Sequence, residues 1–141
     1  KIDTPSILFF LGILLAIAAL QATGVLGSLA LSLDRSVGNI SLVTIIIGLL
    51  SSVVDNVPLV AAAQGMYSLD QYPTGHFFWE FLAYCAGTGG SCLIIGSAAG
   101  VAAMGLEKIE FFWYLRKIGW LAFLGYLAGV AVFLLQHQLF G

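Results

Sequence analysis

The apolar residues of this chain form long runs, and the polar residues gather where the runs break. The first run, residues 5–22, has the length of a membrane-spanning helix and opens with Pro5, a residue suited to a first helical turn. In the segment 25–38, a second apolar run, residues 25–33, is too short to cross a bilayer and is followed by Asp34 and Arg35. We therefore predict a transmembrane helix followed by a short interfacial segment and a turn.

The next run, residues 40–67, is interrupted at Asp55–Pro58, where a charge, an amide and a helix breaker fall together. At about 1.5 Å per residue, the arms Ile40–Val54 and Pro58–Tyr67 reach roughly 22 and 15 Å, so each is shorter than the ~30 Å hydrocarbon core. The pattern favours a re-entrant helical hairpin, and a single interrupted span is the alternative that stays open.

A loop precedes a second interrupted segment, residues 77–104. Its two halves, Phe77–Ala86 and Ser91–Met104, are helical in composition. Between them, Gly87–Gly90 contains three glycines, which free the backbone from helical geometry. We predict one discontinuous transmembrane helix with its break at the glycines.

The end of the chain predicts an interfacial helix followed by a spanning helix. Residues 107–117 mix charged and aromatic side chains, as is typical at headgroup depth, and residues 118–138 are again apolar enough to span. Under the hairpin model one side of the membrane carries Lys1, Lys108, Arg116 and Lys117, and the other carries Arg35. A single span also gives a four-to-one division, because Lys1 and Arg35 change sides together, so charge does not fix the orientation.

Composition supports a membrane protein: 60% of the 141 residues are hydrophobic and 9% are charged, whereas a soluble domain is typically about a quarter charged. The net charge of −2 and the absence of a basic run exclude nucleic acid as a partner. Cys85 and Cys92 lie in apolar helical sequence, which argues against a disulfide framework. The chain begins at Lys1 with a helix that lacks signal-peptide features. We therefore expect a fragment or one part of a split transporter. Its expected partners are the missing N-terminal part and the lipid bilayer.

Both interruptions are rich in oxygen ligands. Broken helices at membrane depth occur where they line a cavity, and their freed carbonyls and helix ends bind cations in secondary transporters. Na⁺ is a hard cation that prefers such oxygens, and no His or Cys cluster has transition-metal spacing. The predicted ion-binding residues are Ser51, Ser52, Asp55 and Asn56 in the first interruption, and Thr88, Ser91 and the backbone of Gly87 and Gly89 in the second. The hydroxyls of Thr88 and Ser91 can alternatively satisfy local backbone groups.

Asp55 is the acidic residue that lies within an apolar arm, where a charge costs roughly 2.5–3.5 kcal/mol at the bilayer centre. Loss of solvent favours the protonated carboxyl group and bound Na⁺ favours the carboxylate, so H⁺ and Na⁺ would compete at Asp55. Such competition is the simplest mechanism of antiport. The alternative is that Asp55 only caps the returning arm, ahead of Pro58.

Three further features have weaker implications. Glu80 and His76 flank the start of a half-helix, where they have a routine helix-end role or line an access path. The spacings Gly96-x-x-x-Gly100 and Gly125-x-x-x-Gly129 are typical of close helix packing, within the fold or between subunits.

Two motifs carry a family resemblance. The segments Ser51–Val60 (SSVVDNVPLV) and Ala86–Ser91 (AGTGGS), together with Phe111–Leu115 (FFWYL), resemble NhaD-type sodium/proton antiporters of the ion transporter superfamily. The resemblance implies two inverted repeats, of which this chain is the C-terminal one, an elevator-like movement and a homodimer. It also assigns Asp55 and Asn56 to the hairpin tip, and Thr88 and Ser91 to the broken-helix loop.

The sequence thus predicts an all-α, multi-pass protein of the bacterial inner membrane that exchanges Na⁺, or Li⁺, for H⁺ in pH and salt homeostasis. Na⁺ and H⁺ are transported, and no cofactor is expected. Enzyme activity is not expected, because an intramembrane aspartyl protease needs two carboxylates in one site and Asp34 and Asp70 fall in predicted loops. The alternatives are an anion carrier for dicarboxylate or arsenite, which Asp55 would disfavour by repulsion, and a noncatalytic membrane subunit.

Overall fold

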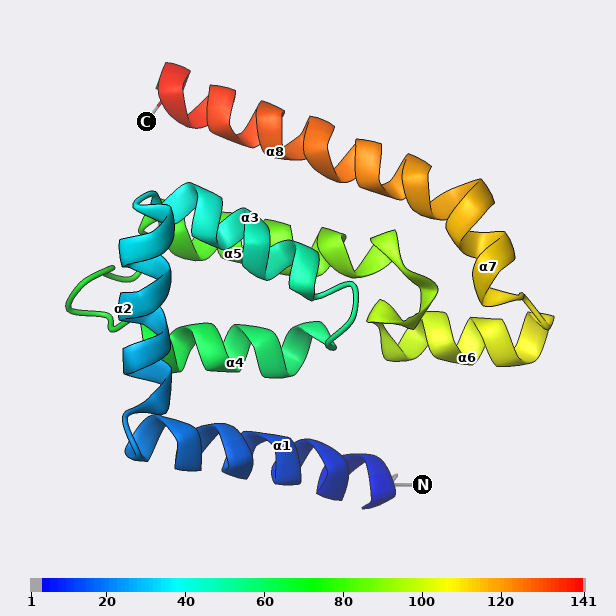
Figure 1. The fold of residues 1–141 in the computed structure, drawn as a ribbon, viewed down its shortest axis with the longest axis horizontal. Coiled ribbons are helices and arrows are strands. Elements are labelled where there is room, and N and C mark those ends of the chain that lie inside the picture. Colours follow the sequence, from blue (N-terminus) through cyan, green and yellow to red (C-terminus); the bar gives the residue numbers. More distant parts are fainter. Residues whose placement is uncertain (1–3, 141) are drawn as a thin grey trace.

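The computed structural model describes residues 4–140, and the regular elements within this range are all helical (Figure 1). Lys1, one of the basic residues counted above on the two sides of the membrane, lies outside the described residues. The elements are α1 (Thr4–Ala22), α2 (Val25–Val37), α3 (Ile40–Leu50), α4 (Asn56–Met66), α5 (Phe77–Gly89), the 3₁₀ turns η1 (Gly90–Cys92) and η2 (Ile94–Gly96), α6 (Ala98–Glu107), α7 (Phe111–Tyr114), the π segment η3 (Leu115–Gly119) and α8 (Trp120–Phe140). The prediction of an all-α chain is confirmed.

The first two helices meet at a sharp bend. The axis turns by 73° between the end of α1 and α2, across Gly24, whose φ of 75° is readily adopted only by glycine. At the far end of α2, Gly38 also has a positive φ, and its N–H donates to the carbonyl of Asp34. Asp34 was expected in a loop, and this expectation is wrong: the glycine cap keeps the helix intact through Asp34.

The two arms of the interrupted run form a helical hairpin. Figure 1 shows α3 and α4 running in opposite directions and joined by Ser51–Asp55, which we call the tip. The side chain of Asn39 caps α3 by accepting from the backbone of Ser41 and Leu42. The second arm begins at Asn56 rather than at Pro58, because proline in the first turn loses no intrahelical hydrogen bond.

The second interruption differs from the prediction in position. Helix α5 continues through Gly87 to Gly89 instead of ending at Ala86, and α6 begins at Ala98 instead of Ser91. The start of α6 is set by Ser97, whose side chain accepts from the N–H of Gly100 at 3.0 Å. We call residues Gly90–Ser97 the break.

The end of the chain also differs from the prediction. The segment Phe111–Phe140 is one helix of 30 residues, in which α7, η3 and α8 follow without interruption. Aromatic residues expected in a separate interfacial helix at 107–117 therefore form the first turns of the last helix. By length and composition, this helix could cross a membrane. Among the described residues, the bent pair Leu15–Ala22 and Val25–Val37 could also do so if the two helices are taken together.

Two buried clusters hold the helices together. One joins α2 through α5 and includes Val43, Tyr67, Phe78 and Leu82. The other joins α5 to α8 and contains Phe81, Cys85, Cys92, Tyr126 and Val130. Both cysteines are buried and free, as predicted. The opposite face of α8 exposes large apolar side chains, including Leu121, Leu124 and Val132, a surface suited to contact with lipid or with another helix.

Candidate functional site

The end of α3, just before the tip, is held against the end of α5 by direct contact between two glycines. A Cβ atom added at Gly89 would overlap the carbonyl of Gly48, and one added at Gly48 would lie 2.7 Å from the carbonyl oxygen of Cys85. Only glycine at both positions lets the backbones of α3 and α5 approach this closely. This packing also explains why α5 stays helical through Gly89: the glycine is needed for contact, not for a break.

The hydroxyl groups next to this contact donate hydrogen bonds to backbone carbonyls. Ser51 is fully buried, and its Oγ lies 2.7 Å from the carbonyl oxygen of Gly48 and 2.9 Å from that of Ala86. Ser52 Oγ donates to the carbonyl of Leu49, and Thr88 Oγ1 donates to the carbonyl of Tyr84, each at 2.7 Å. A hydroxyl whose hydrogen is occupied offers only lone pairs to a further partner, which suits a cation. The bonds of Ser52 and Thr88 also fit local back-bonding to the preceding turn.

Backbone carbonyls from the tip and from the break converge on Gly96. The position that a Cβ atom would take at Gly96 lies 2.7 Å from Ser52 O and 2.8 Å from Ser51 O, and closer still to Gly90 O. Within residues 4–140, no backbone N–H donates to Ser51 O or Ser52 O. Ser51 O and Ser52 O, which lack such donors, are drawn together with Gly90 O and create a region of negative potential, which a hard cation would stabilise.

Gly96 was predicted to be part of a helix-packing face with Gly100, and that interpretation is wrong. Gly96 belongs to the 3₁₀ turn η2, whereas Gly100 lies in α6, so the two residues do not share a helix face. The sequence did contain a signal for this: Ser97 followed by Gly100 is compatible with an N-cap, which would have placed Gly96 in the break.

Asp55 occupies the N-cap position of α4, but its carboxylate accepts no hydrogen bond from the first turn. The residue is partly exposed, at the end of the tip. Asp55 therefore stands at the cap position without making a capping hydrogen bond. A carboxylate left free beside an oxygen-rich turn is available to bind H⁺ or a cation.

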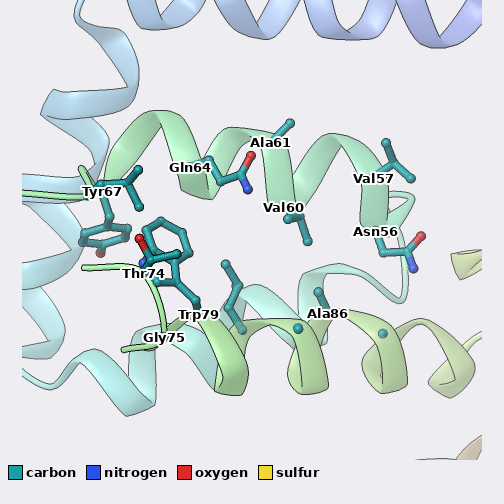
Figure 2. Close-up of a pocket in the computed structure, with 14 residues that line it drawn as sticks. Asn56, Val57, Val60, Ala61, Gln64, Tyr67, Thr74, Gly75, Trp79 and Ala86 are labelled. Atoms are coloured by element: carbon teal, nitrogen blue, oxygen red, sulfur yellow. The ribbon is translucent and has the colours of Figure 1, made fainter. Parts of the chain in front are cut away.

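A groove of about 990 Å³ runs between α4 and α5. Figure 2 shows Asn56 at one end, beside the tip, and Tyr67 and Thr74 at the other. The space exists because the facing side chains are small, including Ala61, Ala83, Ala86 and Gly87. The polar side chains of Asn56, Gln64 and Thr74 line the groove along its length. Two predicted site residues, Asn56 and Gly87, thus border one space.

The far end of the groove is fixed by a buried hydrogen bond. Tyr67 is 1% exposed, and its hydroxyl donates to Asp34 Oδ1 at 3.1 Å, which ties α4 to α2. In the loop that follows, burial and then the nearby Asp34 carboxylate raise the pKa of Tyr72, so this phenol stays neutral at physiological pH. Asp34 therefore lies beside this end of the groove, bonded to Tyr67.

Three other predicted residues lie away from the groove. Ser91 is exposed, and its carbonyl accepts from the hydroxyl of Tyr114 at 2.8 Å. Glu80 is exposed on α5 and is not among the residues that line the groove. His76 caps α5, since its Nδ1 accepts from the N–H of Phe78 at 3.1 Å, and it lines a different cavity together with His137. A helix-end role thus accounts for His76.

Comparison with known proteins identifies relatives of this chain. The citrate transporter family model matches residues 1–80. The chain is 54% identical over 139 residues to sodium/proton antiporter 1 of Arabidopsis thaliana, with 99% of the chain and 24% of that protein covered. It is 50% identical over 138 residues to sodium/proton antiporter 2 of the same plant, with 98% and 33% covered. It is 36% identical over 136 residues to the Na⁺/H⁺ antiporter NhaD of Alkalimonas amylolytica, with 95% and 27% covered. No solved structure shows a significant match.

The chain spans between about a quarter and a third of the length of these curated relatives. The family match covers more than half of the chain, and the antiporter relatives cover nearly all of it. The chain therefore belongs to the citrate transporter family and is an NhaD-type member of the ion transporter superfamily, a group of membrane transporters.

Proposed function

We propose that the full-length parent of this chain exchanges Na⁺ for H⁺ across a membrane, and that the chain contributes the tip and the break to the ion site. The observation that carries the proposal is the convergence of carbonyl oxygens from Ser51, Ser52 and Gly90 around Gly96. The names of the three relatives described above, each a sodium/proton antiporter, support the choice of ions.

The mechanism depends on competition at Asp55. When the carboxylate is charged, it attracts Na⁺ to the tip, where carbonyl and hydroxyl oxygens replace water in its coordination shell. When Asp55 is protonated, this attraction is lost and Na⁺ leaves. Asn56, Thr88 and Ser91 stay predicted ligands in this proposal, as do the backbone groups of Gly87 and Gly89. Li⁺ is a second substrate that the same oxygen chemistry would accept.

The groove between α4 and α5 is proposed as the approach to this site. It connects the region around Thr74 and Tyr67 to Asn56 and Gly87, and Asp34 accepts a hydrogen bond from Tyr67 at the end away from the tip. A carboxylate at the mouth of a pathway raises the local concentration of cations. This route replaces the access path that was predicted at Glu80 and His76.

The proposed assembly is larger than this chain. We propose that the chain is the C-terminal one of two inverted repeats, that its hairpin is re-entrant, and that the missing N-terminal part completes the site in a homodimer. The short arms of the hairpin, 11 residues each, support re-entrance. The bacterial inner membrane is the predicted location, and the relatives from Arabidopsis thaliana extend the proposal to plant membranes.

The second candidate is an anion carrier, which the name of the matching family, citrate transporter, favours. In that case Na⁺ at the tip would neutralise Asp55 before a carboxylate substrate binds beside it. The third candidate is a noncatalytic membrane subunit, in which the break would be structural only.

The test is Na⁺-driven proton movement in vesicles that contain the full-length parent, measured across a pH series. We expect exchange in the wild type and its loss in Asp55→Asn, while Asp70→Asn, a matched change in an exposed loop, keeps wild-type exchange. Exchange that survives in Asp55→Asn would refute the competition mechanism. Citrate uptake driven by Na⁺, without proton exchange, would favour the anion carrier instead.

A further inference from the structure

The η1 turn (Gly90–Cys92) is held between two parts of the molecule. On one side, Gly90 faces the tip, and a Cβ atom placed on it would lie 3.4 Å from Ser51 O. On the other side, the carbonyl of Ser91 accepts from the hydroxyl of Tyr114 at 2.8 Å. The turn that supplies one of the converging carbonyls is thus tied to the last helix by a hydrogen bond from outside the site.

A second contact links the last helix to the same turn. Gly119 is buried, and a Cβ atom at this position would lie 2.8 Å from the carbonyl oxygen of Cys92. Tyr114 directly precedes the π segment Leu115–Gly119 and Gly119 is its last residue; the helix is locally wider in this segment. Such π segments occur frequently at functional sites, since they change the direction in which side chains and backbone are presented.

From these two contacts we infer that Tyr114 and Gly119 are positioning residues that hold the η1 turn in the geometry that binds the ion. The inference rests on the proposed function. Tyr114 does not contact the ion: it fixes the carbonyl of Ser91, and through the turn it fixes the preceding carbonyl of Gly90. The last helix thereby sets the affinity of the site, and any movement of α7 relative to the break would change that affinity.

The inference predicts a change in affinity rather than in maximal rate. Phenylalanine at position 114 keeps the ring and removes only the hydroxyl, which leaves Ser91 O without its donor. A hydrogen bond of this kind typically corresponds to roughly a three- to tenfold change in an equilibrium constant. We expect the KM for Na⁺ of Tyr114→Phe to rise by about this factor, with little change in maximal rate.

A matched control is available on α5. Tyr84 also joins the last helix through its hydroxyl, which donates to the carbonyl of Tyr126 at 3.3 Å, but it does not bond to the η1 turn. The experiment measures KM for Na⁺ and maximal rate of Na⁺-driven proton movement for the full-length wild type, Tyr114→Phe and Tyr84→Phe. A raised KM in Tyr114→Phe alone supports the inference, and equal KM values in both variants overturn it.

A second pair of variants keeps the test decisive if Tyr114→Phe does not reach the membrane. In Gly119→Ala the added methyl group would lie 2.8 Å from Cys92 O, whereas a Cβ atom at Gly125, on the same helix, meets no atom within 4 Å. We expect Gly119→Ala to raise the KM for Na⁺ and Gly125→Ala to leave it unchanged; the same KM in both would overturn the inference. A wild-type parent without Na⁺-driven exchange would instead overturn the proposed function itself.

Discussion

Gly96→Ala is the substitution that tests the carbonyl cluster most directly. The backbone of Gly96 does not have a positive φ, so alanine introduces no conformational strain and adds only one methyl group. That methyl group would lie 2.7 Å from Ser52 O and 2.8 Å from Ser51 O, and it would overlap Gly90 O. All three atoms belong to the backbone, so they cannot move aside as a flexible side chain would.

The size of the effect follows from these distances. Ordinary van der Waals contact begins near 3.4 Å, so each carbonyl must move by about 0.6 Å or more, and overpacking of this kind typically costs about 1–3 kcal/mol. If this free energy destabilises the ion-bound conformation relative to the ion-free one, the KM for Na⁺ should rise by roughly 5- to 150-fold. The assay is Na⁺-driven proton movement in vesicles, together with thermal unfolding of the purified parent without Na⁺.

Gly105→Ala is the control, because a Cβ atom at this exposed position of α6 meets no atom within 4 Å. It should behave as the wild type in both assays. A wild-type KM for Na⁺ in a folded Gly96→Ala protein would show that the converging carbonyls do not bind the ion, and the reasoning from this cluster would be refuted.

Two more predictions concern the contacts around the site. Ser51→Ala removes the hydroxyl that bonds to the carbonyl of Ala86. We expect the free energy of unfolding of the purified parent, measured by denaturation, to fall by about 1–2 kcal/mol. An unchanged free energy of unfolding would mean that this bond does not hold the tip. Ala83→Phe places a ring in the groove and should slow Na⁺-driven exchange while Na⁺ binding, measured calorimetrically, persists. Ala103→Phe, on α6 and outside the groove, is its control, and equal rates in the two variants would contradict the proposed approach.

The arrangement of helices could be predicted largely from local signals. The two arms on either side of the tip follow from the charge, amide and proline at Asp55–Pro58, which interrupt an otherwise apolar run. The first arm, however, ends at Leu50 rather than at the expected Val54. The bend at Gly24 and the cap at Asn39 have equally local causes. These features depend on the conformational preferences of one or two residues, and such preferences are visible in the sequence.

The exact position of the break could not be predicted in this way. Gly87, Gly89 and Gly90 look alike in the sequence, and a helix breaker was the natural interpretation of all three. In the structure Gly87 lines the groove, Gly89 allows α5 to contact α3, and only Gly90 begins the break. Which role a glycine has depends on the segment packed against it, and that segment is 41 residues away for Gly89 and Gly48.

The same reasoning explains why the candidate site itself was only partly predicted. Side-chain chemistry pointed to Ser51, Ser52 and Asp55, because hydroxyl and carboxylate groups are unusual in an apolar run. Carbonyl groups are present at every residue, so the sequence cannot show which of them lose their hydrogen-bond donors and face one another. Gly96 and Tyr114 have their roles only because the tip, the break and the last helix meet at η1. An ion site built mainly from backbone oxygens is therefore a property of the packing, and substitutions of the glycines and tyrosine that set this packing will test it more sharply than substitutions of polar side chains.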